Sequence, residues 1–401
     1  MMPPPRKSPH PPAVVLGLTT NGLSFVRSLG RRGIPVTMLE TLSWHPGMTS
    51  RYGVPCPVPD ITEQPDAWLT ALDAIARRDE RPVLIATGDE HILFVSRHRE
   101  YLERHFRFRI PAAGLAEALC DKQAQYERLL DLDCPLPKTA FVTPGQADLF
   151  EFAERTIGFP CVVKPSFSHL WRRRATGVKL RLAHTPDALR AALRDMVETG
   201  EPFVLQEFIP GGDDAIHCYL AHYGEDGRPL ASMTKQKLRQ NPPRCGNGAF
   251  QISTHNPEVT ALSEQILGRL AYQGLVATEF KWDVRDSRYK LMEINPRSVS
   301  GNQLAVDVDV DLPFVYYRDV LGLPVPTIAS YRSNVKYLHL GWDLQAFLIE
   351  HRAGRMPLFP WFRSLLGARS FALFNWRDPR PFLTYAWEGL RSFRSAQRFP
   401  S

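Results

Sequence analysis

The sequence has no long apolar run and no paired spacing among its six cysteines. A membrane-spanning helix needs about 18 or more uncharged apolar residues in succession, and no such stretch is present, so we expect no transmembrane segment. The cysteines form no CxxC pair, which favours free thiols in a reducing cytoplasm. They lie at positions 56, 120, 134, 161, 218 and 245.

A strong charge of one sign is also missing. The chain has 49 basic and 42 acidic residues, a net charge of +7, and no Lys/Arg run with interleaved aromatic residues. This argues against a nucleic-acid partner, while a mild positive charge suits an anionic ligand or a membrane surface. With 401 residues, 44% of them hydrophobic, the chain is predicted to be globular with two or three domains.

Two common nucleotide-binding motifs are absent near the N-terminus. Residues 13–39 predict a strand, a helix ending at Gly33 and a second strand, an opening typical of a parallel sheet. Gly17 and Gly22 do not form GxGxxG, and no GK[ST] follows, which argues against a dinucleotide fold and a P-loop. A tight turn before a helix explains both glycines, and the helix N-terminus would still suit a carboxylate.

Polar residues follow the buried strand at 82–87, which ends in Gly88-Asp89-Glu90 before another helix. The carboxyl ends of parallel strands are where open α/β sheets bind ligands. Asp89 and Glu90 are therefore candidates for a substrate site, and a helix cap is the alternative for Asp89.

An acidic hairpin is predicted at 277–297, with a three-residue turn at 285–287. In this register Glu279 lies opposite Glu293, and Asn295 follows one repeat along the same face, because strand side chains alternate every second residue. Phe280, Trp282, Met292 and Ile294 would form the apolar face. Two carboxylates and a carboxamide are oxygen ligands suited to Mg²⁺. The alternative is an amphipathic surface hairpin with solvated charges.

Basic residues recur on several other predicted elements. A helix at 115–132 carries Asp121-Lys122, and Lys164 ends a buried strand, where a lysine is rarely left without an anionic partner. On the strand at 232–239, alternation would place Lys235, Lys237 and Arg239 on one face. Three such cations repel one another, so either an anionic group lies over them or they fan into solvent.

A loop at 166–177 follows Lys164 and contains Trp171 and the arginines at 172–174. A loop between antiparallel strands can fold over phosphates with its backbone N–H groups. The alternative is a mobile surface loop.

Taken in order, these pieces resemble the ATP-grasp superfamily of ATP-dependent carboxylate ligases. The ordered motifs are DK, GFPCVVKP, the loop, VLQEFIPGGDD, KQKLR, EFK and LMEINPR. The resemblance covers residues 115–325, and it is closest to the D-aspartate-ligase-like carboxylate–amine ligases through ATGDE, QEFIPGGDD, EFK and EINPR. The loop at 166–177 departs from the pattern, because many relatives carry Gly and Ser there.

The resemblance implies an α/β, or more finely α+β, ATP-grasp architecture. A disordered leader at 1–12 would precede a Rossmann-like pre-ATP-grasp domain at 13–114. The ATP-grasp domain would have a small lobe at 115–202 and a catalytic lobe at 203–330. A helical C-terminal extension at 331–401, rich in aromatic residues and arginine, would follow.

The resemblance also implies residue roles. ATP phosphates would be held by Lys122 and Lys164. Adenine would meet the hinge Gln206, Glu207, Phe208 and Ile209, through the Glu207 carbonyl and the Ile209 N–H. The ribose would be held by Asp213 or Asp214. Mg²⁺, or Mn²⁺ in its place, would be ligated by Glu279, Glu293 and Asn295. The γ-phosphate and acyl phosphate would face the catalytic residues Arg297, Lys237 and Arg239.

The implied activity is a ligase reaction that activates a carboxylate as an acyl phosphate and joins it to an amine, releasing ADP and phosphate. Small-molecule acids and amines, amino acids among them, are the expected substrates, and a homodimer is a candidate assembly. Two alternatives stay open: an ATP-grasp kinase and a catalytically silent ATP-binding module.

The segment 331–401 has two interpretations. Amphipathic helices usually face a core, which predicts an extra helical layer packed on the catalytic domains. The alternative is a segment that contacts a membrane surface or a partner.

Overall fold

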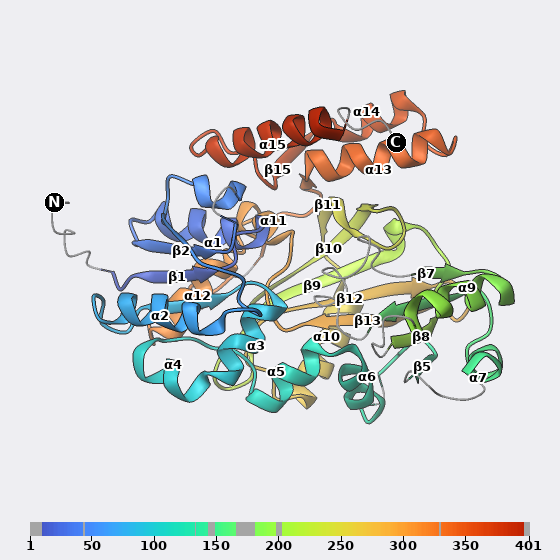
Figure 1. Ribbon diagram of the computed structural model, residues 1–401, viewed down its shortest axis with the longest axis horizontal. Coiled ribbons are helices and arrows are strands. Elements are labelled where there is room, and N and C mark those ends of the chain that lie inside the picture. The colour runs from blue at the N-terminus through green and yellow to red at the C-terminus, as the bar shows by residue number, and fades with distance from the viewer. Residues whose placement is uncertain are drawn as a thin grey trace.

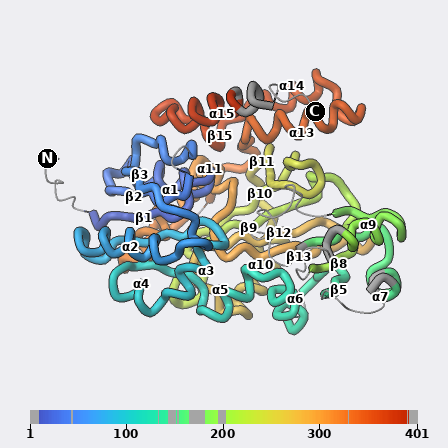
Figure 2. The backbone as a smooth tube through the Cα atoms, in the orientation of Figure 1, coloured from blue at the N-terminus to red at the C-terminus, as the bar shows by residue number. Residues whose placement is uncertain are grey.

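The computed structural model describes residues 10–42, 45–132, 134–142, 149–165, 181–197, 203–328 and 330–396. The loop predicted at 166–177 lies outside these residues. Figure 1 shows an N-terminal α/β unit on one side, a small sheet on the opposite side and a long sheet between them. The C-terminal helices form a layer along one edge, and the tube in Figure 2 follows the chain through the same parts.

The N-terminal sheet is parallel, as the sequence predicts. Its order is β3-β2-β1-β4, with β1 (Ala13–Leu16), β2 (Val36–Glu40), β3 (Val54–Pro57) and β4 (Val83–Ala86). Every residue of β1 and β4 is buried, as expected for strands with helices on both faces of the sheet. The accompanying helices are α1 (Thr20–Gly30), α2 (Pro65–Ala76), α3 (Asp89–Arg97) and α4 (Arg99–His105), and a short helix, η1 (Pro46–Thr49), follows β2.

The small sheet is antiparallel. Its order is β5-β8-β6-β7, with β5 (Thr139–Val142), β6 (Cys161–Pro165), β7 (Arg181–Ala183) and β8 (Phe203–Glu207). Two helices, α7 (Leu149–Thr156) and α9 (Pro186–Val197), accompany it, and its apolar side chains form a core of their own. This sheet brings Lys164, on β6, beside Gln206, on β8.

The largest sheet has the order β13-β12-β9-β10-β11-β14-β15. Its long antiparallel strands are β9 (Ile216–Tyr223), β10 (Pro229–Asn241), β11 (Asn247–Thr254), β12 (Gly274–Asp283) and β13 (Arg288–Asn295). A short helix, η2 (Asp213–Ala215), precedes β9, and α10 (Pro257–Arg269), α11 (Asn302–Asp307) and α12 (Leu312–Val320) complete this part.

The predicted helix at 115–132 is two helices, α5 (Ala113–Cys120) and α6 (Lys122–Leu130). Asp121 lies between them with extended backbone, and its carboxylate accepts hydrogen bonds from Gln123 N at 2.8 Å and Ala124 N at 3.3 Å. An aspartate that caps a new helix ends the previous one, so Lys122 becomes the first residue of α6. Asp311 likewise caps α12, which separates it from α11.

The predicted C-terminal helices are present as α13 (Leu340–Arg352), α14 (Leu358–Leu365) and α15 (Arg380–Ala396). The sequence did not predict β14 (Lys336–Leu338) and β15 (Ala368–Phe371), which extend the largest sheet beyond β11. A buried ion pair of 2.9 Å between Arg27 and Asp378 also ties this region to α1. Among the residues described, no helix combines the length and apolar character needed to cross a bilayer.

Candidate functional site

A cavity of about 970 Å³ is lined by the small sheet, the largest sheet, segments that follow strands of the N-terminal sheet, and the C-terminal helices. One end, called here the hinge end, is lined by residues 206–209, Lys122, Lys164 and the hairpin β12–β13. The other, called the far end, is lined by loops of the N-terminal sheet and by the C-terminal helices. The predicted site residues on its wall are Lys122, Lys164, Gln206, Glu207, Phe208, Ile209, Lys237, Glu279, Glu293, Asn295 and Arg297.

The hairpin register places its acidic residues as predicted. Glu279 pairs with Glu293, and Asn295 lies opposite Ala277. The connection between the strands differs from the predicted three-residue turn. The turn spans residues 284–287, and the register shifts between Glu279 and Phe280. Met292 is the extra residue of this β-bulge, so it lines the cavity beside Glu293 instead of joining Ile294 in the core.

Lysine ammonium groups lie against both hairpin carboxylates. Lys237 Nζ is 2.7 Å from Glu279 Oε2, and Lys122 Nζ is 3.3 Å from Glu293 Oε1. Burial acts to raise the pKa of Glu293, but the charges of Lys122 and Lys164 outweigh it and leave that pKa below its ordinary value. The Glu293 carboxylate is therefore charged at neutral pH.

The pKa values of Lys164 and Lys237 shift in opposite directions, although burial acts to lower both. Burial, with the nearby charge of Lys122, lowers the pKa of Lys164 to about 8, and its Nζ donates to Gln206 Oε1 at 2.8 Å. Burial also acts to lower the pKa of Lys237, but the charge of Glu279 outweighs it and leaves that pKa raised. Lys164 therefore loses its proton at a lower pH than Lys237 does. A bound anion would stabilise the charged form of Lys164.

All four residues of the hinge 206–209 line the cavity, and the side chains of the first three contact neighbouring groups. Buried Gln206 donates to Thr139 Oγ1 at 3.1 Å and to the Tyr126 hydroxyl. The Glu207 carboxylate accepts from Lys138 N at 2.8 Å and pairs with Arg285 at 3.0 Å. Lys281 Nζ lies 4.8 Å from the centre of the Phe208 ring.

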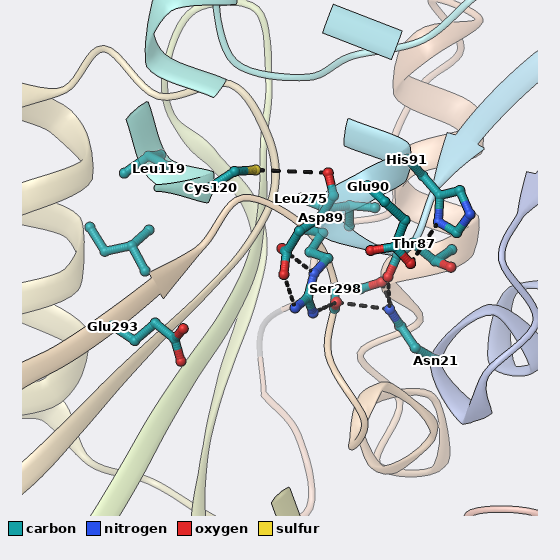
Figure 3. Close-up of polar contacts among 12 residues, drawn as sticks. Asn21, Thr87, Asp89, Glu90, His91, Leu119, Cys120, Leu275, Glu293 and Ser298 are labelled. Carbon is teal, nitrogen blue, oxygen red and sulfur yellow. Dashed lines mark hydrogen bonds and ion pairs between the residues drawn. The ribbon is translucent and has the colours of Figure 1, made fainter. Parts of the chain in front are cut away.

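Arg297 joins the largest sheet to the N-terminal domain. Its guanidinium donates to both carboxylate oxygens of Asp89, at 2.6 and 3.0 Å, and Asp89 raises the pKa of Arg297 despite its burial. Asn21 Nδ2 bridges Thr87 O and Ser298 O, both at 2.8 Å. Figure 3 shows Asp89, Asn21 and Ser298 converging, with Glu293 facing the same space from the hairpin.

The capping interpretation of Asp89 is wrong. Helix α3 begins at Asp89 itself, its N-cap is Gly88, and no side chain caps it. The carboxylate instead holds Arg297, a residue more than 200 positions later in the chain. Asp89 and Glu90 both line the cavity, which places them at the far end beside Arg297.

The prediction that Lys235, Lys237 and Arg239 share a face is also wrong, because a β-bulge separates the last two. Lys237 pairs with Gln251, whereas Arg239 pairs with Phe250, one residue on. Arg239 therefore points away from the cavity and donates to Asp343 of α13, at 2.7 and 3.0 Å. Its guanidinium also lies 4.4 Å from the centre of the Phe250 ring.

Asp213 and Asp214 are close to the hinge but are not on the cavity wall as described. The Asp213 carboxylate accepts from Gln240 N at 2.8 Å and from Arg244 N at 3.0 Å, which holds the connection between β10 and β11. Asp214 is exposed. Their ribose-binding role stays a prediction.

Sequence reasoning missed Lys235 as a member of the site, although its alternation with Lys237 was the available signal. Lys235 Nζ donates to Gln251 Oε1 at 2.6 Å, and burial lowers the pKa of Lys235. A Cβ on Gly301 would lie 2.2 Å from this Nζ, so a larger residue there would displace the Lys235 ammonium group.

The far-end wall from the C-terminal region had no sequence signal of its own. It is lined by His339, Trp342, Gln345, Leu373, Tyr385, Glu388 and Gly389. The rings of His339 and Trp342 stack with centres 4.0 Å apart, and burial lowers the pKa of His339 to about 4. His339 is therefore neutral at physiological pH and serves as an aromatic surface.

The donor set at the hairpin fits a hard cation. Glu279, Glu293 and Asn295 offer carboxylate and carboxamide oxygens from one face of the hairpin, and all three line the cavity. Mg²⁺ is typically bound by one or two carboxylates, together with waters and substrate phosphates. Among the residues described, no cluster of three or more His, Cys, Asp or Glu side chains could hold a metal by itself.

Comparisons with known proteins agree with this geometry, although no family model matches the chain. It is 26% identical over 234 residues to a D-aspartate ligase from Enterococcus faecium (strain Aus0004), which covers 57% of this chain and 56% of that relative. It is 22% identical over 249 residues to a formate-dependent phosphoribosylglycinamide formyltransferase from Vibrio cholerae serotype O1, covering 58% of each. The chain thus spans little more than half the length of these curated relatives.

Solved structures show the same fold at low identity. The ADP complex of PurK, an N5-carboxyaminoimidazole ribonucleotide synthetase, has a TM-score of 0.66 and 14% identity, covering 86% of this chain and 85% of that chain. The biotin carboxylase domain of Hydrogenobacter thermophilus 2-oxoglutarate carboxylase, solved with MgADP and bicarbonate, has a TM-score of 0.63 and 14% identity, covering 82% and 74%. The chain has the ATP-grasp fold, and over a little more than half of its length it is similar in sequence to ligases such as the D-aspartate ligase.

Proposed function

We propose that this protein is an ATP-dependent ligase that activates a substrate carboxylate as an acyl phosphate and joins it to an amine, releasing ADP and phosphate. One observation carries the proposal. Two in-register carboxylates, Glu279 and Glu293, face a cavity in which Lys122, Lys164 and Lys237 surround them. Paired acids and converging lysines are what a magnesium-bound triphosphate requires.

ATP would occupy the hinge end of the cavity. Adenine would meet the backbone at 206–209, and the phosphates would lie beside Lys122 and Lys164. Glu279, Glu293 and Asn295 would hold Mg²⁺, which when bound neutralises phosphate charge. Arg239 is left out of this arrangement, because its guanidinium is engaged by Asp343.

The first chemical step is attack of a substrate carboxylate oxygen on the γ-phosphorus, with the bond to ADP breaking. Phosphoryl transfer depends on positioning and charge neutralisation more than on covalent help. Arg297 and Lys237 line the cavity on the way from the hairpin to the far end and would supply that charge. In the second step a neutral amine attacks the acyl carbon, phosphate leaves, and the nitrogen loses a proton.

The two substrates would meet at the far end. Arg297 and Lys235 offer cationic groups for a carboxylate, whereas Glu90 and Glu388 offer carboxylates for an amine. This mixture suits amino acids, which carry both charges. The similarity to a D-aspartate ligase supports the same class of substrate.

The test is a screen for ADP and phosphate release over amino acids and other carboxylates, with and without amines, followed by mass spectrometry of the products. We expect release that depends on an acid and an amine, together with an amide whose mass is that of both substrates less water. A stable phosphorylated acid that no amine converts would indicate a kinase instead. Bound ATP without turnover across the whole screen would indicate a silent ATP-binding module.

A further inference from the structure

Exposed apolar side chains gather on the C-terminal layer. Eleven of the seventeen large apolar residues that are exposed in the described part of the chain lie between positions 340 and 387. We call these eleven residues the outer face. They are Leu340, Leu344, Leu348, Ile349, Leu358, Phe359, Phe362, Leu366, Trp376, Leu383 and Trp387.

The outer face follows helical spacing. On α13, Leu340, Leu344 and Leu348 recur every fourth residue and form an exposed stripe, whereas Asp343, Ala346 and Phe347 of the same helix are buried. Phe359 on α14 is 73% exposed, and Trp376, just before α15, is 85% exposed. Figure 1 shows the three helices together on one side of the molecule, lying along its surface.

The C-terminal segment 331–401, which carries the outer face, is basic at its surface. Its four acidic side chains already pair with arginines: Asp343 with Arg239, Glu350 with Arg355, Asp378 with Arg27 and Glu388 with Arg391. Five further arginines are exposed, and no acidic residue of this region is left to balance them. They are Arg352, Arg363, Arg369, Arg377 and Arg380.

We propose that the outer face docks onto an anionic lipid bilayer. Helices with Trp, Phe and Leu on one face and arginines beside them bind in the plane of a membrane, with the apolar groups at the acyl boundary and the cations at the headgroups. A second copy of the chain fits less well. A two-fold contact between identical faces would set these arginines against one another.

The helices that would contact the bilayer also line the cavity on their other side. Trp342 and Gln345 of α13, and Tyr385 and Glu388 of α15, line the far end of the cavity, while the outer face of these helices is exposed. The bilayer and the cavity would therefore be separated by one layer of helices. The proposal goes beyond the ligase activity and does not depend on it.

The test is co-sedimentation of the full-length protein with phosphatidylcholine vesicles, with and without phosphatidylglycerol. We expect binding to the anionic vesicles that weakens as salt is added, and little binding to phosphatidylcholine alone. Point variants are preferable to a truncation at residue 330, because β14 and β15 belong to the largest sheet.

Two triple variants separate the contributions. Phe359→Ser with Trp376→Ser and Trp387→Ser should lose binding to anionic vesicles. Arg363→Gln with Arg369→Gln and Arg377→Gln should weaken it on the order of 100-fold, at about five-fold for each cation removed. A control with Val54→Ser, Leu130→Ser and Val284→Ser, exposed apolar residues outside the outer face, should bind like the wild type.

Several outcomes would overturn the proposal. One is a folded wild type that binds neither kind of vesicle. Another is a control variant that loses binding as far as the outer-face variants do. A third is self-association in the ultracentrifuge that the Phe359, Trp376 and Trp387 changes abolish without vesicle binding, which would assign the face to a second copy. If the apolar variant does not fold by circular dichroism, the arginine variant decides.

Discussion

The two ends of the cavity are built in different ways. At the hinge end, the acids come from one hairpin whose strands pair residue by residue, so that Glu279 and Glu293 meet through local register. At the far end, Asn21, Asp89, Arg297 and Tyr385 come from widely separated parts of the chain. Short-range spacing therefore specifies the first, and only tertiary packing specifies the second.

The charges differ as well. At the hinge end, Lys122 and Lys237 each lie against a carboxylate. Farther along the wall, Lys235 lies in the same cross-strand row as Glu279 but donates to the uncharged amide of Gln251, and burial lowers the pKa of Lys235. Nucleotide binding should thus depend on the hinge end alone, and recognition of the acid and amine on the far end.

The largest effect should come from Glu293→Gln at the hinge end. The change keeps the shape of the side chain but removes the charge that would ligate the metal, so ATP-dependent phosphate release should fall on the order of 1,000-fold. The melting temperature should change little. Glu127→Gln, an exposed position on α6, is the matched control. Normal turnover in a folded Glu293→Gln protein would contradict the metal assignment.

Arg239→Leu should affect the fold more than the chemistry. It leaves the buried Asp343 carboxylate without its ion pair, and breaking such a pair costs about 3–5 kcal/mol in the free energy of unfolding. Urea denaturation measures this loss. Arg355→Leu, which removes an exposed partner of Glu350, is the control and should leave the unfolding midpoint close to that of the wild type.

Activity measured at low temperature distinguishes a structural role for Arg239, as the partner of Asp343, from the catalytic role that the sequence predicts. Below its unfolding transition, Arg239→Leu should still release phosphate. A variant that was as stable as the wild type but inactive would return Arg239 to the site.

Lys164→Met should weaken ATP binding on the order of 100-fold, because a charge-assisted contact to phosphate is lost from a buried position. ATP should then fail to raise the melting temperature at concentrations that stabilise the wild type. Lys138→Met, at an exposed position, should retain the full shift. An equal shift in the Lys164 variant would make this lysine structural.

Much of the hinge end could be predicted from sequence because strand periodicity is strict. Glu279 does pair with Glu293 as predicted, but the turn has four residues where three were expected, and the β-bulge at Met292 compensates for the extra one. The same rule failed at Met292 and at Arg239, since a β-bulge adds one residue to a strand and reverses the alternation beyond it. Neither bulge is marked by a glycine or proline, so neither could be predicted from sequence.

The far end could not be predicted because its contacts are long-range. For Asp89 the sequence leaves two interpretations open, a substrate site and a helix cap, because an acid at the start of a helix is commonly a cap. Its pairing with Arg297 depends on how the N-terminal sheet packs against the largest sheet. The strands β14 and β15 were missed because each is only three or four residues long, too short to show a period.

The pH dependence of ATP binding tests the role of Lys164 at the hinge end without a mutation. With a pKa of about 8, Lys164 loses its proton as the pH rises through 8, so binding should be tight below that pH and weaker above it. The Kd for ATP should rise about ten-fold between pH 7 and pH 9. The charge of Lys122 also lowers the pKa of Lys164, whereas Glu293, Glu279 and Cys245 act to raise it. The Lys164→Met protein should give a flatter profile, and a flat wild-type profile would contradict the assignment.

The smallest effect, and the sharpest separation of the two ends, should come from Glu388→Gln. This half-buried carboxylate lines the far end and pairs with exposed Arg391 at 3.3 Å, a contact weak enough for the carboxylate still to attract an ammonium group. Because the site is partly solvated, its removal should raise the KM for the amine only about three- to ten-fold. The KM for ATP should not change, since the hinge end is untouched. Glu350→Gln on α13, whose carboxylate also pairs with an arginine but does not line the cavity, should leave both constants unaltered. A rise in the KM for ATP in the Glu388 variant would show that the two ends are coupled, and the division drawn between them would fail.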